Sequence, residues 1–349
     1  MPISKKIDIA ILGASGFIGI ELLQRLINHP FINLVFIGSE NYNGELPSAL
    51  FPPLRRHHFF KTMKFNSIDN LCTSDVVISA LPIGVLPNIL TKVLSKTKKI
   101  INVSGDFRLN NLKEIQEYYP KSLLVQNVID NKYVIPDFTN DFSATILNMP
   151  GCIASAAIYA LCPLAENDLL GEEIIIDAKV GSSGSGKTQS DSHSIRANNA
   201  KTYKLLHHRH APEIKQYLNN FTLDIKRVFL TVTSIDITRG ILVHVHGNTK
   251  RKLTETELYS LFRNYYKNHP FHHITCFKKG NEKFPSIKSV QGTNDCEIGF
   301  AVDKTSNHFV ITAAIDNLVK GGAGNAIQTL NKLYGFDINL GLGSNAVWP

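Results

Sequence analysis

Short apolar segments alternate with amphipathic ones over the first 150 residues. Residues 7–12 form an apolar run, and the stretch after it places apolar side chains at helical spacing, at Ile20, Leu22, Leu23, Leu26 and Ile27. Further apolar runs follow at residues 33–37, 75–81 and 99–103. Strands that alternate with helices favour a parallel sheet with helices on both faces. We therefore predict an α/β domain over residues 1–150.

The pattern changes after residue 151, where the apolar runs become longer and helices fewer. The runs that we interpret as strands are residues 173–180, 227–232, 240–246 and 309–315. Residues 255–268 have helical spacing, and a last helix is expected from about residue 322 to 334, with a Gly- and Ala-rich start that allows close packing. These elements predict a second domain over residues 151–319, of the α+β class, built on a mixed and largely antiparallel sheet.

The composition is typical of a folded protein of two domains. Of the 349 residues, 43% are hydrophobic and 19% are charged. No run reaches the roughly 18 apolar residues of a membrane span, and the first residues lack the apolar core of a signal peptide. The cysteines are scattered without a CxxC pair, which favours reduced thiols and a cytoplasmic location. They are Cys72, Cys152, Cys162, Cys276 and Cys296.

The net charge of +8 raises the question of a nucleic-acid partner. The basic residues are dispersed, and no long basic tract or known binding module is present, so we expect no nucleic acid. A positive field also suits a phosphorylated ligand or an acidic protein partner. The pairs His57-His58 and His272-His273 match no standard metal-site spacing, and we predict no metal.

Three glycines, Gly13, Gly16 and Gly19, follow the first predicted strand and open the first predicted helix. This context is the one that a dinucleotide phosphate site requires, because the glycines permit a tight turn and the helix N-terminus supplies N–H donors. The first domain is therefore expected to be a Rossmann-type dinucleotide-binding domain. The expected cofactor-binding residues of this loop are Gly13, Ala14, Ser15, Gly16, Phe17, Ile18 and Gly19.

The end of the second strand bears on which dinucleotide is bound. Glu40 could pair with a ribose diol and indicate NAD, whereas Ser39 and Asn41 could bind a 2′-phosphate and indicate NADP. These residues leave the choice open.

Cys152 opens an apolar stretch and follows Pro150 and Gly151. A helix that starts here would direct its positive dipole end and its unpaired N–H groups toward the sulfur, which favours the nucleophilic thiolate. The alternative is a cysteine buried in a helix.

Residues 207–210, His-His-Arg-His, lie in a loop just before a predicted helix. A neutral imidazole near a thiolate would serve as general acid and base, and Arg209 would hold an anion. The alternative is a solvated loop. A second loop, residues 181–187, is rich in Gly and Ser but lacks the GxxxxGK(S/T) spacing of an NTPase. It either borders a phosphate or forms a surface turn.

These segments together resemble the N-acetyl-γ-glutamyl-phosphate reductases of arginine biosynthesis, and their relatives that act on carrier-protein-linked substrates in lysine biosynthesis. The matching segments occur in the family's order over nearly the whole chain: residues 13–22, 104–109, 150–152, 182–186, 208–214, 239–240 and 316–321.

The resemblance implies an NADP-dependent acyl-phosphate reductase. In this reaction N-acetyl-γ-glutamyl phosphate is reduced to the semialdehyde with release of phosphate, through a thioester on Cys152, with His210 as acid and base and NADPH as hydride donor. The family also implies a homo-oligomer, a tetramer or dimer, in which residues 320–349 return to complete the first domain. The further residues expected at the site are Arg108, Ser155, His208, Arg209 and Glu213 for substrate, and Ser39, Ser183, Gly184, Asn317 and Gly322 for cofactor.

Two features leave the substrate open. The residues after Cys152 read Ile-Ala-Ser rather than the usual Tyr-Pro-Thr of the arginine branch, and residues 191–204 are more similar to the carrier-linked branch. A carrier-linked aminoadipyl or glutamyl phosphate, presented by an acidic amino-group carrier protein, is therefore the alternative. Arg108 either binds an anionic group or pairs only with Asp106. A dehydrogenase of the aspartate-semialdehyde type and a non-catalytic dinucleotide sensor are two further alternatives.

Overall fold

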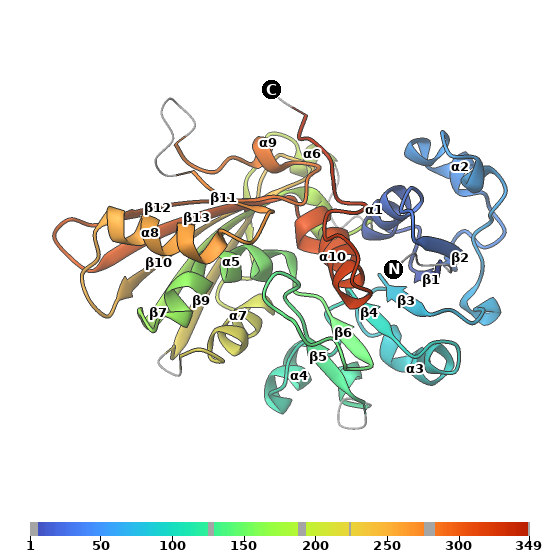
Figure 1. Cartoon of the computed structure of the whole chain (residues 1–349), viewed down its shortest axis with the longest axis horizontal. Helices are drawn as coiled ribbons and strands as arrows, with labels where there is room; N and C mark the ends of the chain where they lie inside the picture. The colour runs from blue at the N-terminus through green and yellow to red at the C-terminus, as the bar shows by residue number, and fades with distance from the viewer. Residues whose placement is uncertain (1–5, 125–128, 188–192, 223–224, 276–282, 348–349) are drawn as a thin grey trace. The chain divides into compact units, whose positions relative to one another are not determined.

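The chain divides into two compact units in a computed structural model (Figure 1). Unit 1 comprises Met1–Pro150 and Gly322–Gly343, and unit 2 comprises Gly151–Gly321 and the residues from Ser344 onward. The structure describes residues 6–124, 129–187, 193–222, 225–275 and 283–347. Cys276 and residues 191–192 of the carrier-like segment lie outside these ranges. The segment that returns to unit 1 ends at Gly343 rather than at residue 349, and the Ser344 hydroxyl donates a hydrogen bond to the Gly292 carbonyl of unit 2 at 2.7 Å.

Unit 1 contains a six-stranded parallel sheet in the order β2-β1-β3-β4-β6-β5. Its strands are β1 (Ile7–Leu12), β2 (Ile32–Gly38), β3 (Val76–Ser79), β4 (Ile100–Asn102), β5 (Asn131–Tyr133) and β6 (Ile146–Asn148). β2 and β3 pair with opposite edges of β1, so the strand order reverses at β1. In open parallel sheets, ligands bind beyond the carboxyl ends of the strands at such a point.

Helices lie on both faces of this sheet, with α1 and α10 on one side and α3 on the other (Figure 1). The α-helices of unit 1 are α1 (Phe17–Leu26), α2 (Pro47–Leu50), α3 (Leu86–Leu94), α4 (Leu112–Tyr118) and α10 (Gly324–Leu333). Short 3-10 turns are η1 (Pro52–Leu54), η2 (His58–Lys61), η3 (Ile68–Asn70) and η4 (Pro120–Leu124). A π-helical turn, η7 (Val319–Ala323), precedes α10.

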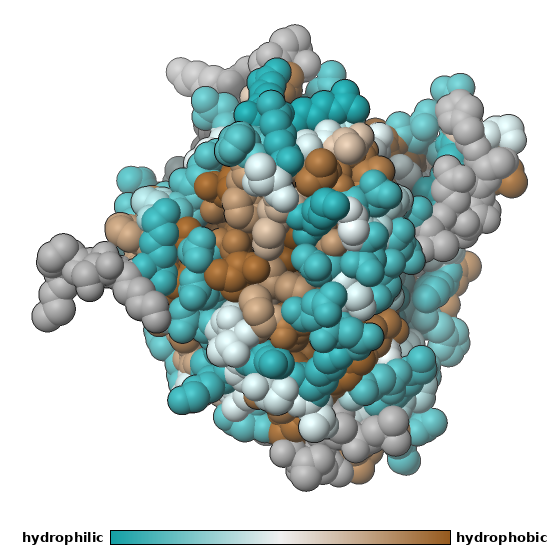
Figure 2. All heavy atoms as spheres, turned by 90° about the vertical axis from the view of Figure 1, so that its right-hand side faces the viewer, coloured by the Kyte–Doolittle hydropathy of each residue, from teal (hydrophilic) through white to brown (hydrophobic). Residues whose placement is uncertain are grey.

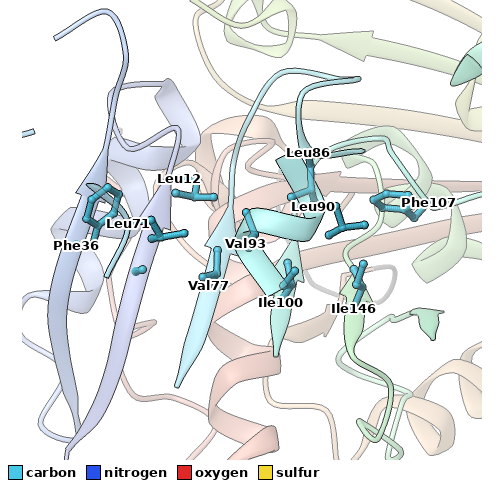
Figure 3. Packing of buried hydrophobic residues seen from close by; sticks show 11 residues of the cluster. Leu12, Phe36, Leu71, Val77, Leu86, Leu90, Val93, Ile100, Phe107 and Ile146 are labelled. Carbon is cyan, nitrogen blue, oxygen red and sulfur yellow. The ribbon is translucent and has the colours of Figure 1, made fainter. Parts of the chain in front are cut away.

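The core of unit 1 shows why these residues form a helix on a sheet (Figure 3). Leu86, Leu90 and Val93 recur at helical spacing and project from α3 onto the sheet, where Val77 and Ile100 are fully buried. Each fully buried aliphatic side chain contributes roughly 1.5–3 kcal/mol by leaving water. This core fixes the strands whose carboxyl ends carry the glycine loop.

Unit 2 contains a seven-stranded mixed sheet in the order β11-β12-β13-β10-β7-β9-β8. Four of its strand pairs are antiparallel, while β11 pairs with β12 and β7 with β9 in parallel. The strands are β7 (Leu170–Val180), β8 (Lys201–Tyr203), β9 (Arg227–Ser234), β10 (Ile241–Thr249), β11 (His272–Ile274), β12 (Cys296–Val302) and β13 (His308–Ile315).

Three helices, α5, α7 and α8, pack on one face of this sheet. Burial alternates along β7, where Ile174, Ile176 and Ala178 are buried while Asp177 and Lys179 on the other face are half-buried. The helical elements of unit 2 are α5 (Cys152–Glu166), α6 (His193–Arg196), α7 (His210–Leu218), α8 (Glu255–Tyr266), α9 (Ile287–Val290) and the 3-10 turn η6 (Ser182–Ser185).

The predicted fold class is confirmed in both units. The sequence did not predict β5, β6, β8, β11 or β12, each of which has at most seven residues. Of these, β5, β8 and β11 read Asn-Lys-Tyr, Lys-Thr-Tyr and His-His-Ile, so no apolar run marks them as strands. In the part of the chain that the structure describes, no helix is both long and apolar enough to cross a membrane.

Candidate active site

The three glycines of the first loop have different structural roles. Gly13 has φ +73°, and a Cβ there would lie 2.5 Å from the Ala80 carbonyl oxygen; a Cβ on Gly19 would lie 2.3 Å from the Gly13 carbonyl oxygen. Both glycines are therefore required by the protein's own packing. A Cβ on Gly16 would approach nothing closer than 3.4 Å, so Gly16 has open space beside it. Close approach of a ligand explains a glycine that packing does not require.

Gly16 is also the N-cap of α1, with no side chain capping the helix. The N–H groups of Phe17 and Ile18 follow it at the positive end of the helix dipole, which is a suitable place for a pyrophosphate. Phe17 and Ile83, which follow the carboxyl ends of β1 and β3, are 40% and 41% exposed. Figure 2, which faces the side of the molecule on which α2 lies, shows apolar side chains gathered among hydrophilic ones. The residues present fit a dinucleotide.

Ser15 and Ser39 meet at the end of β2, with their hydroxyl oxygens 2.7 Å apart. Both carboxylate oxygens of Glu40 accept hydrogen bonds within the protein. One accepts from the Ser67 hydroxyl at 2.9 Å and the other from the Ile68 N–H at 2.7 Å. The structure thus gives Glu40 a role in holding the chain after β2.

Asp106 joins the loops that follow β3 and β4. Its fully buried carboxylate accepts hydrogen bonds from the Gly84 N–H, at 2.8 and 3.0 Å, and from the hydroxyls of Ser104 and Ser122, at 2.9 and 3.0 Å. Arg108 is 5% exposed, and one of its guanidinium N–H groups donates to the Val103 carbonyl at 2.8 Å. Both residues therefore shape the carboxyl edge of the sheet in unit 1.

In unit 2, Cys152 is the first residue of α5, and Gly151 is its N-cap. The predicted helix start is confirmed, and the sulfur lies at the positive end of a 15-residue helix without a side-chain cap. Cys152 is partly exposed, whereas Cys162 of the same helix is fully buried. The N-terminus of a helix is an environment that favours a thiolate over a thiol.

Glu213 joins the start of α5 to the start of α7. Its fully buried carboxylate accepts a hydrogen bond from the Gly151 N–H at 2.6 Å, and its other oxygen lies 4.0 Å from His210 Nε2. Gly151 directly precedes Cys152, and His210 is 3% exposed. The sequence suggested that Glu213 binds substrate; in the structure its carboxylate lies between the residue before Cys152 and the His210 imidazole.

His208 is held in its neutral form. Burial, with the charges of Arg209 and Lys204, lowers the pKa of His208 to about 3. Its Nδ1 accepts a hydrogen bond from the His210 N–H at 3.2 Å, and the two rings are 4.6 Å apart. His208 therefore caps the first turn of α7 and fixes His210 at its start.

Two further side chains lie near the cysteine. Burial and the negative charge of Cys152 raise the pKa of Tyr203 to about 12, so Tyr203 stays protonated as a hydrogen-bond donor. The buried Nε of Arg209 has no hydrogen-bond partner among the described residues. A buried guanidinium N–H without an acceptor suits an anionic ligand.

The remaining predicted residues lie on the supporting elements. Ser155 is fully buried on α5, and its hydroxyl donates to the Gly151 carbonyl at 3.1 Å. Asn317 donates to the Ser183 hydroxyl at 3.0 Å and accepts from the Gly240 N–H at 2.7 Å. Gly184 is exposed in η6, and Gly322 is buried in η7. Within the described ranges, no cluster of three His, Cys, Asp or Glu side chains could hold a metal ion.

Comparison with known proteins agrees with this arrangement. Two family models match the chain, "semialdehyde dehydrogenase, NAD binding domain" over residues 8–162 and "semialdehyde dehydrogenase, dimerisation domain" over residues 152–317. A curated relative from Lactiplantibacillus plantarum, named N-acetyl-gamma-glutamyl-phosphate reductase 1, is 38% identical over 98% of this chain and 99% of its own length. The chain belongs to the N-acetyl-γ-glutamyl-phosphate reductase family.

The family also includes the second branch expected from the sequence. A relative from Nitrosopumilus maritimus, 32% identical over 98% of this chain and 99% of its own, is named as a reductase of LysW-linked L-2-aminoadipate and L-glutamate phosphates. The predicted family, the oxidoreductase class and a nicotinamide dinucleotide cofactor are thereby confirmed.

Solved structures show the same fold. Aspartate semialdehyde dehydrogenase II from Vibrio cholerae has a TM-score of 0.73 at 15% identity, covering 95% of this chain and 99% of its own. The enzyme from Candida albicans, solved with NADP, has a TM-score of 0.73 at 13% identity, covering 96% and 100%. At this identity the likeness concerns the fold alone.

The sequence missed three features of the reductase site. Tyr203 lies in a three-residue strand, and the hydrogen bond from Gly151 to Glu213 joins positions 62 residues apart. The third is Gly321, on which a Cβ would lie 2.7 Å from the Cys152 Cβ. No local pattern reports such contacts, although each residue lies within a segment that carries the family resemblance or just before it.

Proposed function

We propose that this protein reduces N-acetyl-γ-glutamyl phosphate to N-acetylglutamate semialdehyde with NADPH, and that Cys152 carries the acyl group. The observation that supports this most strongly is the link from the N-cap of the Cys152 helix, through the Glu213 carboxylate, to His210. Nucleophile, imidazole and orienting carboxylate form the arrangement typical of nucleophilic catalysis.

In the first step the Cys152 thiolate attacks the carbonyl carbon of the acyl phosphate. A carbon–sulfur bond forms, the carbon–oxygen bond to phosphate breaks, and phosphate leaves with the electron pair of that bond. The N-terminus of α5 stabilises the thiolate before attack. Arg209, whose Nε is buried without an acceptor, is proposed to hold an anionic group of the substrate.

When bound, the reduced dinucleotide supplies the hydride that converts the thioester to a thiohemiacetal. His210 donates a proton to the developing oxyanion and then removes the proton from the resulting hydroxyl. The carbon–sulfur bond then breaks, which releases the aldehyde and restores the thiolate. Glu213, 4.0 Å from His210 Nε2, stabilises the imidazolium between these transfers.

NADP is the proposed form of the cofactor. The Ser15 and Ser39 hydroxyls at the end of β2 would donate hydrogen bonds to a 2′-phosphate, while both carboxylate oxygens of Glu40 already accept hydrogen bonds within the protein. The cofactor residues proposed in unit 1 are Gly13, Ala14, Ser15, Gly16, Phe17, Ile18, Gly19 and Ser39, and those proposed elsewhere are Ser183, Gly184, Asn317 and Gly322.

The carrier-linked substrate is the second candidate. The names of the archaeal relatives and the net charge of +8 favour it, because an acidic carrier would be attracted. Arg108, Ser155, His208, Arg209 and Glu213 are the proposed substrate-side residues in either case. Assays with the free acetylated and the carrier-linked acyl phosphates will separate the two.

Self-association is proposed through the sheet face of unit 2 that α5, α7 and α8 do not cover. The match to a dimerisation domain spans this sheet, and Ile175 on this face is 52% exposed. Sedimentation of the intact protein measures the state. The cytoplasmic location stays a prediction.

The direct test compares Cys152→Ala with Cys72→Ala in an assay of NADPH oxidation that depends on acyl phosphate. Cys72 lies in unit 1 and is likewise partly exposed, so it controls for the loss of a thiol. We expect no turnover in the first variant and unchanged turnover in the second. Turnover by a folded Cys152→Ala protein would exclude the thioester route.

A further inference from the structure

Lys320 is a fully buried lysine in unit 2, with an exposed fraction of 0%. Lysine is almost never buried to this extent without a specific partner. Its ammonium lies 5.1 Å from the ring centre of Tyr159 and 5.1 Å from that of Phe271. Both distances fall within the range of cation–π attraction, about 6 Å. The Lys320 ammonium therefore lies against two aromatic rings.

Tyr159 is itself fixed in place. Pro163 lies inside α5 and has no N–H, so it cannot donate to the carbonyl of Tyr159 four residues earlier. The buried hydroxyl of Tyr266, on α8, donates to this carbonyl instead. The Tyr266 ring stacks on His272, with ring centres 4.5 Å apart. Tyr266 and His272 thus hold the Tyr159 ring, which with Phe271 faces the Lys320 ammonium.

Lys320 also lies in the π-helical turn η7, next to Gly321. The Gly321 N–H donates to the Asp316 carbonyl at 2.9 Å, the spacing of a π-turn, and such turns are frequent at functional sites. A Cβ on Gly321 would lie 2.7 Å from the Cβ and 3.1 Å from the Cα of Cys152. The backbone beside Lys320 therefore packs directly on the cysteine.

We propose that Lys320 is a positioning residue, whose cation–π contacts hold Gly321 against Cys152 and whose buried charge stabilises the Cys152 thiolate. This proposal rests on the proposed role of Cys152 as nucleophile. It adds a second positive element to the α5 dipole.

The size of the electrostatic effect follows from the helix. The Lys320 ammonium lies over the Tyr159 ring, and Tyr159 is seven residues beyond Cys152 on α5, about 10 Å along the axis. We take this length as the order of magnitude of the separation between the charge and the sulfur. At an effective dielectric constant of about 20, loss of a unit charge at about 10 Å raises a thiol pKa by about one pH unit.

The other charged and titratable groups around these two residues stay unchanged in the variants below. Tyr203 interacts with Cys152, and Arg209 with Tyr203. On α7, His210 and Glu213 lie next to the start of α5. His272 lies against the Tyr159 ring, with ring centres 4.7 Å apart.

The test uses Lys320→Met, which keeps the length of the side chain and removes its charge, and Lys320→Arg, which keeps the charge. Lys332→Met is the matched control. Lys332 lies in unit 1, over the Phe142 ring at 5.6 Å, and donates to the carbonyls of Pro136 and Thr139. For each protein, the rate of iodoacetamide modification is measured from pH 5 to 10, with mass spectrometry resolving the peptide that contains Cys152.

In Lys320→Met the midpoint of the modification profile is expected to rise by about one pH unit, with roughly tenfold slower modification below the midpoint. In Lys320→Arg and Lys332→Met the midpoint is expected to stay within about 0.3 pH unit of the original. An unchanged midpoint in folded Lys320→Met would overturn the proposal. This readout needs neither substrate nor cofactor, so it fails or succeeds separately from the proposed reaction, which the Cys152→Ala assay tests.

Phe271→Leu keeps the charge and removes one ring, and it covers the case in which Lys320→Met does not fold. A weakened contact is expected to lower kcat by about tenfold with an unchanged KM for NADPH and an unchanged modification midpoint. An unchanged kcat in Phe271→Leu would contradict the positioning role.

Discussion

The cofactor loop of unit 1 and the cysteine site of unit 2 are built in different ways. The loop is a local device, in which Gly13, Gly16 and Gly19 lie within seven consecutive residues between β1 and α1. The cysteine site joins positions far apart in the chain, including Gly151, Tyr203, Glu213 and Gly321. A glycine loop of this kind can be recognised from the spacing of its residues, whereas a site built from distant residues becomes visible only when the fold is known.

The two regions also use glycine differently. At Gly13 and Gly19 the protein's own backbone excludes a side chain, and at Gly16 it does not. At Gly321 the excluded volume is that of the cysteine itself. Substitutions at Gly13 and Gly19 therefore test packing, a substitution at Gly16 tests ligand binding, and one at Gly321 tests the placement of the Cys152 sulfur.

The largest expected effect concerns His210. The His210→Asn variant is expected to lose roughly 10²–10⁴ in kcat, because a positioned acid and base contributes about this factor. Steady-state assays across pH provide the measurement, and the basic limb of the profile should flatten. A variant with the original pH profile would show that His210 does not transfer the proton.

The next effect concerns Gly321. In Gly321→Ala the new methyl group would meet the Cys152 Cβ at 2.7 Å, so either the turn or the cysteine must move. A displacement on the order of 1 Å costs about 10² in kcat. Gly343→Ala, where a Cβ meets nothing within 4 Å, is the control and should keep full activity. Equal kcat in the two variants would refute the contact.

Gly16 and Gly19 give a paired comparison in unit 1. Gly16→Ala is expected to keep the melting temperature and to weaken NADPH binding by about tenfold, because the methyl group enters the space left for the pyrophosphate. Gly19→Ala is expected to lower stability by about 1–3 kcal/mol through overpacking. Calorimetric titration and thermal unfolding measure the two effects. The reverse pattern would mean that Gly16 is structural.

A further prediction concerns the pH dependence of stability that comes from His208. Its pKa is about 3 in the folded chain and about 6.5 in the unfolded one, so the unfolded state binds the proton first as pH falls. Stability is therefore lost between pH 6.5 and 3, by up to about 1.4 kcal/mol per pH unit from this residue.

His208→Asn is the matching variant, because its side-chain oxygen can still accept from the His210 N–H and does not titrate. Urea unfolding from pH 7 to 4 should show a shallower loss of stability for this variant than for the original protein. Identical slopes would mean that His208 is protonated in the folded state.

Particular residues show how far the sequence could reach. The strand at Ile7–Leu12, the glycine loop and the helix start at Cys152 each depend on neighbours in sequence, and all three were predicted. The hydrogen bond from Gly151 to Glu213 was not predicted, because it forms only after α5 and α7 pack together.

Lys320 illustrates the same limit. Its position in a segment that resembles the family was visible, but neither its burial nor the rings of Tyr159 and Phe271 around it follow from spacing. The sequence therefore predicted which residue types form the site, while the buried contacts that hold them in place are visible only in the fold.

Direct detection of the acyl group on Cys152 tests the central claim most closely. The protein is mixed with the acyl phosphate in the absence of cofactor, quenched in acid and digested, and phosphate release is followed in parallel. The account predicts a burst of about one phosphate per active chain and an acyl mass increase on the peptide that contains Cys152. No burst and no acylated Cys152 peptide, from a preparation that turns over once NADPH is added, would contradict it.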